Sequence, residues 1–105
     1  MVSICRDIPQ GHILGVVSGR IATVQSLYIR PPYRNRKYAT MLLLTFLHLA
    51  FKENAIHVEL DDCSSNYRKP SNIYIKNGFR YSSTDHRMCA NIRQTIKLMK
   101  FKNLL

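Results

Sequence analysis

The stretch LYIRPPYRNRKYATMLLL, residues 27–44, decides the fold of this 105-residue chain. It begins within a run of β-branched and aromatic residues that predicts a strand over residues 21–29. Two prolines end that strand, and a basic loop of residues 33–37 follows them. From residue 38 to residue 53 the chain is rich in good helix formers and apolar on nearly every side, which predicts a buried helix.

A helix start that follows a strand and a basic loop can bind an anion. The first N–H groups of a helix have no partner within the helix and carry partial positive charge, so phosphates bind there readily. Arg34, Arg36 and Lys37 would add positive charge at this point. A solvated basic loop without a ligand is the alternative interpretation.

The remaining segments complete a small sheet. Residues 56–60 alternate between apolar and polar side chains, and they follow a helix that follows a strand. Such a unit makes its two strands parallel through a right-handed crossover. Further patterns predict strands at 1–5, 12–17, 79–81 and 95–101, a short helix at 71–76, and a strand plus connecting loop within 82–94. The predicted fold class is α+β: a mixed, largely antiparallel sheet of about six strands with one crossover and two helices, in a single domain over residues 1–105.

Composition limits the classes of function. Sixteen Lys and Arg oppose six Asp and Glu, for a net charge of +10, so the expected partner is nucleic acid, an acidic surface or a phosphate-rich cofactor. Three cysteines and four scattered histidines have neither disulfide-framework nor metal-ligand spacing, which favours a reducing, cytoplasmic compartment and no metal. The most apolar run, residues 38–51, is shorter than the roughly 20 residues that cross a bilayer, so we expect a soluble chain.

The loop and the helix resemble the core motif of the GNAT family of N-acetyltransferases. That motif reads approximately L-x-V-x-P-x-Y-R-G-x-G-x-G/A before a Leu-rich helix. A second segment, IYIKNGF at residues 73–79, is similar to the family's L-Y-x-K-x-G-F. The family usually has glycine at the positions of Asn35 and Lys37, and its members usually carry further N-terminal elements, so the resemblance implies an N-terminally reduced domain.

The resemblance implies acetyl-CoA as co-substrate and direct transfer of its acetyl group to a primary amine. The residues it implies for cofactor binding lie on the strand, the basic loop and the helix start, with one further residue downstream. They are Leu27, Tyr28 and Ile29 for pantetheine, Arg34, Asn35, Arg36, Lys37, Tyr38 and Ala39 for the pyrophosphate, and Asn66.

The resemblance also implies that Tyr74 protonates the departing thiolate. For the base that deprotonates the amine, the residues themselves indicate Glu59, with Asp61 second. Both share a strand face with His57, near the place where the resemblance puts the amine. The alternative is that these carboxylates are solvated or pair with nearby arginines and lysines.

Two other functions stay open at this point. A catalytically inactive GNAT-fold binding module would account for Lys37 and the short N-terminus. A basic nucleic-acid-binding protein would account for the tyrosines among the cations, although no nucleic-acid motif is present. The amine acceptor, protein or small molecule, is not identified by the sequence, and a dimer is compatible with it.

Overall fold

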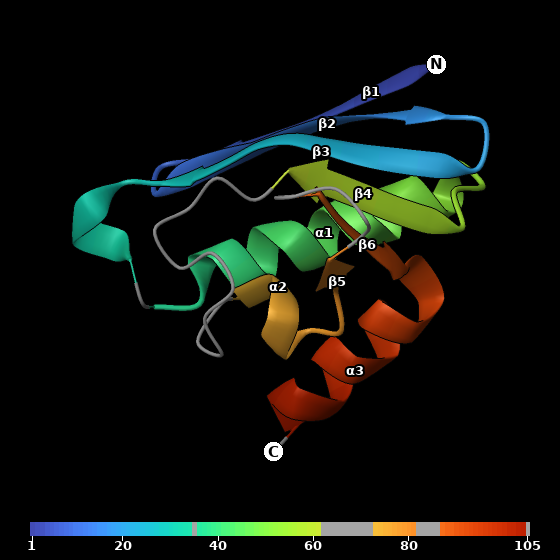
Figure 1. Ribbon diagram of the computed structural model, residues 1–105. Coiled ribbons are helices and arrows are strands. Elements are labelled where there is room, and N and C mark those ends of the chain that lie inside the picture. The colour runs from blue at the N-terminus through green and yellow to red at the C-terminus, as the bar shows by residue number, and fades with distance from the viewer. Residues whose placement is uncertain (35, 62–72, 82–86, 105) are drawn as a thin grey trace.

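Six strands form one twisted sheet in the order β1-β2-β3-β4-β6-β5, with the helices on one side of it (Figure 1). The structure is a computed structural model that describes residues 1–34, 36–61, 73–81 and 87–104. The strands are β1 (Val2–Ile8), β2 (Gly11–Ser18), β3 (Ile21–Ile29), β4 (His57–Asp61), β5 (Arg80–Tyr81) and β6 (Arg87–Asn91). The helices are the 3-10 turn η1 (Pro31–Tyr33), α1 (Tyr38–Lys52), α2 (Ile73–Lys76) and α3 (Ile92–Leu104).

One pair of neighbours in this sheet is parallel and the other four are antiparallel. The parallel pair is β3 with β4, and α1 connects them. The pairs β1–β2, β2–β3, β4–β6 and β5–β6 are antiparallel. The predicted mixed sheet of six strands with one β-loop-α-β crossover is therefore confirmed.

The core lies between the sheet and the helices, mainly α1 and α3. Five side chains of α1 are buried, and the helix packs on β1, β2 and β3; these side chains are Leu42, Leu43, Phe46, Leu47 and Ala50. Phe46 lies directly over Gly15, where an added Cβ would come within 2.6 Å of the Phe46 ring. A glycine in β2 thus makes room for the largest fully buried side chain of the core.

The predicted strand at residues 95–101 is wrong, because these residues belong to α3. Ile92, Thr95, Ile96 and Met99 are buried, at the i, i+3, i+4, i+7 spacing of one helix face. The alternation of TIKLMKF imitates a strand only because Ile96 and Leu98 flank a lysine. The structure therefore has a third helix where two were predicted, and the strand expected within 82–94 is β6.

Asn91 sets the start of α3. Its side-chain Oδ1 accepts a hydrogen bond from the backbone N–H of Gln94, 3.0 Å away. This is N-cap geometry, and asparagine is among the preferred residues for it. The cap ends β6 and starts the helix at one residue, so the antiparallel pairing with β4 stops there as well.

Candidate functional site

Strands β3 and β4 pair over only four residues each and then part. Their parallel register runs from Ile21 opposite His57 to Val24 opposite Leu60. Strand β3 continues for five more residues, to Ile29. Its register with β2 shifts at the same level, because Leu14 is opposite Ser26 whereas Gly15 is opposite Val24. Gln25 is the extra residue of this bulge, which bends β3 where β4 leaves it.

Beyond the bulge, one edge of β3 still pairs with β2, whereas the other edge faces the gap that opens where β4 ends its pairing with β3. Arg30 N–H donates to the Gln10 carbonyl on the β2 side, at 2.8 Å. Because backbone directions alternate along a strand, the N–H and C=O groups of Leu27 and Ile29 point to the opposite side. The Ile29 carbonyl accepts there from Arg34 Nε, at 2.9 Å. Part of a strand edge thus faces the gap between β3 and β4.

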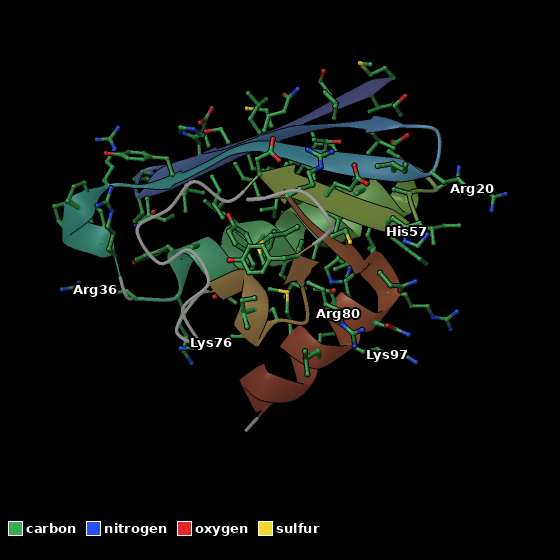
Figure 2. All side chains as sticks on the ribbon, viewed as in Figure 1. Arg20, Arg36, His57, Lys76, Arg80 and Lys97 are labelled. Carbon is green, nitrogen blue, oxygen red and sulfur yellow. The ribbon has the colours of Figure 1, made fainter. Side chains whose placement is uncertain are left out.

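The loop between β3 and α1 is held back against β3 by Arg34. Besides its bond to Ile29, the Arg34 guanidinium carbon lies 5.5 Å from the centre of the Tyr28 ring. The Tyr28 ring in turn lies 5.9 Å from the His12 ring. Arg36 is exposed on the same loop, at the end of the molecule opposite Arg20 (Figure 2). Asn35, predicted to contact the pyrophosphate, lies outside the described residues.

Lys37 has a left-handed backbone at the N-cap of α1. Its φ is 68° and its ψ is 7°, a conformation that glycine adopts at little cost and other residues rarely adopt. Its carbonyl accepts the first helical bond, from Met41 N–H at 3.0 Å, and its side chain does not cap the helix. The family's preference for glycine at this position therefore has a physical counterpart in the backbone of this chain.

The other predicted cofactor residues gather around this helix start. Ile29 is buried, while Leu27, Tyr38 and Ala39 are partly buried and pack against the core. Tyr38 meets Tyr33 edge to face, with ring centres 6.0 Å apart. The structure thus brings the residues of the first motif together between the end of β3 and the first turn of α1. Asn66 lies outside the described residues.

Tyr74 lies in α2, apart from the loop in sequence. It is partly buried, and its ring lies 5.5 Å from that of Phe79 in an edge-to-face contact. Its backbone carbonyl accepts hydrogen bonds from the N–H groups of Asn77 and Phe79. The second motif therefore forms one compact turn, which fixes the backbone that carries Tyr74.

Arg87 on β6 joins the two carboxylates predicted as bases. Its Nη2 lies 2.5 Å from Glu59 Oε2, and its Nη1 lies 3.3 Å from Asp61 Oδ1. The hydrogen bond to Glu59 raises the pKa of Arg87 above its ordinary value, with a smaller contribution from Asp61. Pairing with a nearby arginine or lysine was the alternative that the sequence left open, and the partner is Arg87 because the β4–β6 register brings it there.

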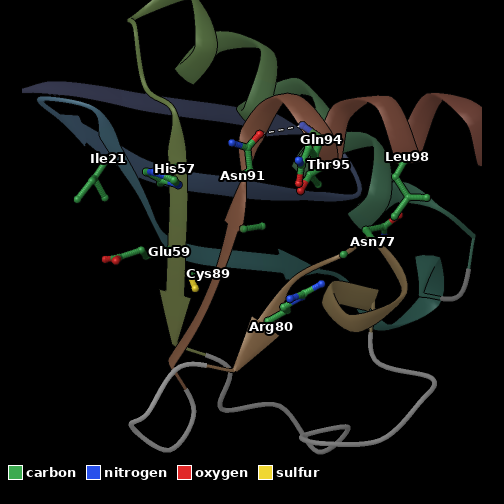
Figure 3. Close-up of a pocket in the computed structure, with 12 residues that line it drawn as sticks. Ile21, His57, Glu59, Asn77, Arg80, Cys89, Asn91, Gln94, Thr95 and Leu98 are labelled. Carbon is green, nitrogen blue, oxygen red and sulfur yellow. Dashed lines mark hydrogen bonds between the residues drawn. The ribbon is translucent and has the colours of Figure 1, made fainter.

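A hollow of about 580 Å³ lies beside Glu59 (Figure 3). Its lining comes from the start of β3, from β4, the turn after α2, β5, β6 and the first turns of α3, and includes His57, Glu59, Arg80, Cys89, Asn91 and Gln94. Two lining residues of this hollow, Arg80 and Asn91, were not predicted from the sequence. Asn91 could have been predicted as the N-cap of a helix, because asparagine is a preferred residue there. Nothing in the sequence around Arg80 indicates that it lines a site.

The fold is thus a six-stranded mixed sheet in which β3 parts from its parallel neighbour β4 before the loop that leads to α1. A sequence model of the acetyltransferase (GNAT) family matches residues 2–79, and the chain belongs to this family. A search of curated proteins found no match.

Solved structures give the same fold. The PaiA N-acetyltransferase from Thermoplasma acidophilum, solved with coenzyme A, has 26% identity and a TM-score of 0.67, over 77% of this chain and 52% of that one. Ard1 from Thermoplasma volcanium has 23% identity and a TM-score of 0.62, over 77% and 62%. The anti-CRISPR protein AcrVA5 has 14% identity and a TM-score of 0.69, over 87% and 100%. The chain thus spans little more than half the length of the first two proteins and matches the whole of the third.

Among the described residues, no helix has the length and apolar character needed to cross a membrane.

Proposed function

We propose that this chain transfers an acetyl group from acetyl-CoA to a primary amine. The observation that carries the proposal is the parting of β3 from β4 after Val24 and Leu60, next to a helix whose N-cap has a left-handed backbone. The family membership supports acetyl transfer as the reaction, and the relative solved with coenzyme A supports the donor.

The residues around the gap fit such a donor. The first N–H groups of α1 follow Lys37 and have no side-chain cap, so they are suited to a pyrophosphate. Arg36 and Lys37 are exposed and add two positive charges there. The backbone groups of Leu27 and the N–H of Ile29 would pair with the amides of pantetheine along the open edge of β3.

Two proton transfers accompany the reaction: the amine loses a proton and the departing sulfur gains one. When bound, acetyl-CoA supplies the acetyl carbon, which forms a bond to the amine nitrogen as its bond to sulfur breaks. Glu59 would take the proton that the amine gives up, directly or through water, with Asp61 as the second candidate. Tyr74 would give its phenolic proton to the departing sulfur. Arg87 orients both carboxylates on the outer face of β4.

Calorimetric titration with acetyl-CoA tests the proposal. We expect micromolar binding, and weaker binding of CoA that lacks its 3′-phosphate. A short oligonucleotide serves as an anionic control and should bind weakly, with a steep dependence on salt. Acetyl-CoA binding no tighter than oligonucleotide binding would contradict the proposal.

A further inference from the structure

One row of side chains crosses four strands on the outer face of the sheet. Thr23 on β3 is in register with Glu59 on β4, Glu59 with Cys89 on β6, and Cys89 with Arg80 on β5. Residues in register point to the same face, and neighbouring strands lie about 4.8 Å apart. The Cα atoms of Glu59 and Arg80, two strands apart, are therefore about 10 Å from each other.

The hollow beside Glu59 contains most of this row. Figure 3 shows Glu59, Cys89 and Arg80 in succession along it, with Asn91 and Gln94 at the start of α3. Its volume of about 580 Å³ falls within the roughly 300–1,000 Å³ of small-molecule sites. Glu59 and Arg80 thus belong to one site of the size that a small substrate needs.

The two ends of the hollow have opposite charge. At the β4 end, Glu59 and Asp61 share one arginine, Arg87, which leaves one negative charge when His57 is counted as neutral. At the β5 end, Arg80 has no carboxylate partner among the residues that the structure describes. A ligand with a cationic end and an anionic end would match this distribution.

Asn91 adds hydrogen-bond donors to the hollow at the level of His57, with which it is in register. Because its Oδ1 accepts from Gln94 N–H, the cap holds the amide in one orientation. The Nδ2 hydrogens of Asn91 are then the donors left to the hollow, and the exposed Gln94 side chain lines it as well. The guanidinium of Arg80, at the other end, is suited to a carboxylate or a phosphate.

We infer that the acceptor is a small amine that also bears a carboxylate or phosphate, with its amine at Glu59 and its anionic group at Arg80. This inference rests on the proposed acetyl transfer, because it identifies the acceptor of that reaction. Arg80 binds the substrate in this arrangement and takes no part in the proton transfers.

Matched amines test the inference on the full chain with acetyl-CoA. The pairs are 5-aminopentanoate with pentylamine, and 3-aminopropyl phosphate with propylamine, so that the two anionic groups are tested separately. We expect kcat/KM to be about tenfold to a hundredfold higher for at least one anionic amine than for its neutral partner. Arg80→Gln should abolish this preference by lowering kcat/KM for the anionic amines. Arg80→Lys, which keeps the charge but loses the planar fork, should retain part of it.

Arg93→Gln is the matched control, because Arg93 is exposed on α3 and outside the hollow. It should leave the preference unchanged. If acetyl-CoA binds and the anionic and neutral amines react equally well, or if the preference survives Arg80→Gln, the inference is wrong while the proposed function stands.

A binding measurement covers the case in which no amine is acetylated and acetyl-CoA does not bind. The proposed function then fails, and the side-chain amide resonances of Asn91 are followed by NMR as 5-aminopentanoate and 3-aminopropyl phosphate are added. A saturable shift that Arg80→Gln removes would support anion recognition in the hollow. No shift with either probe would overturn the inference.

Discussion

The guanidinium carbon of Arg34 lies 5.5 Å from the centre of the Tyr28 ring, and Arg34 Nε donates to the adjacent Ile29 carbonyl at 2.9 Å. The first arginine of the basic loop is thus engaged with the strand that precedes it. Arg36 and Lys37 have no such contact with the described residues. The loop therefore combines one cation that is bonded to β3 with two exposed cations that are not.

Substituting Arg34→Met should lower the free energy of unfolding by about 1–2 kcal/mol, because a hydrogen bond and a cation–π contact are lost. Arg36→Met should change it by less than about 0.5 kcal/mol, as is usual at exposed positions. Urea denaturation measures both. Equal effects of the two substitutions would show that Arg34 does not hold the loop.

Lys37→Gly should increase the free energy of unfolding by about 0.5–1 kcal/mol. The left-handed backbone at φ 68° costs about 1–2 kcal/mol for a residue with a Cβ, and the greater freedom of glycine in the unfolded chain offsets part of the gain. Lys37→Ala keeps the Cβ and removes the charge, so it should give no such gain. If alanine stabilised the chain as much as glycine, charge and not backbone conformation would be the cause.

Tyr74→Phe should reduce kcat about a hundredfold or more, because the proposed proton donor is lost while the ring contact with Phe79 can remain. The KM for acetyl-CoA should change little. Tyr81→Phe, a second partly buried tyrosine of the same region, is the control and should retain activity. Steady-state kinetics with a reactive amine decides, and an unchanged kcat in Tyr74→Phe would remove Tyr74 from the proposed chemistry.

Gly15→Ala should destabilise the fold by about 3 kcal/mol or more, or prevent folding. The new Cβ would lie 2.3 Å from the Thr23 carbonyl and 2.6 Å from the Phe46 ring, so backbone or core must shift. Gly19→Ala meets no atom within 4 Å and has only its positive φ of 61° to accommodate, which costs about 1 kcal/mol. Thermal and urea unfolding should rank the two in this order, and the reverse order would contradict the packing of α1 on β2.

Arg87→Gln should lower the free energy of unfolding by about 1 kcal/mol or less, because the ion pairs with Glu59 and Asp61 are partly exposed. The pKa of Arg87 is raised in the fold by its bond to Glu59, so its stabilisation is complete below the ordinary arginine pKa and is lost only as the pH rises through the raised value. The difference between wild type and variant should therefore be the same at about pH 7 and pH 10. A difference that fell over this interval would contradict the assignment.

The strand, loop and helix over residues 21–53 could be predicted because their signals are local. β-branched residues, two prolines and a run of helix formers each favour their element whatever surrounds them. The same reasoning failed at residues 95–101. There the buried face of α3 is set by packing against α1 and by the Asn91 cap, whereas the local alternation favours a strand.

Some features of the candidate site could likewise be predicted from the sequence, and others could not. The basic loop and the two motifs could be found from residue types and spacing. The partner of Glu59 could not, because Arg87 is 28 residues away and is brought there by the β4–β6 register. The same register, together with the β5–β6 pairing, puts Arg80 in one row with Glu59.

By itself, therefore, the sequence determined the crossover unit, the helix start and the family resemblance, since each depends on neighbours along the chain. Only the tertiary structure decided that Lys37 has a left-handed backbone, that β3 parts from β4 after Val24, and that Glu59 and Arg80 line one hollow. These features depend on strand register and on how α1 and α3 pack, and such long-range contacts are set by the burial of the whole core.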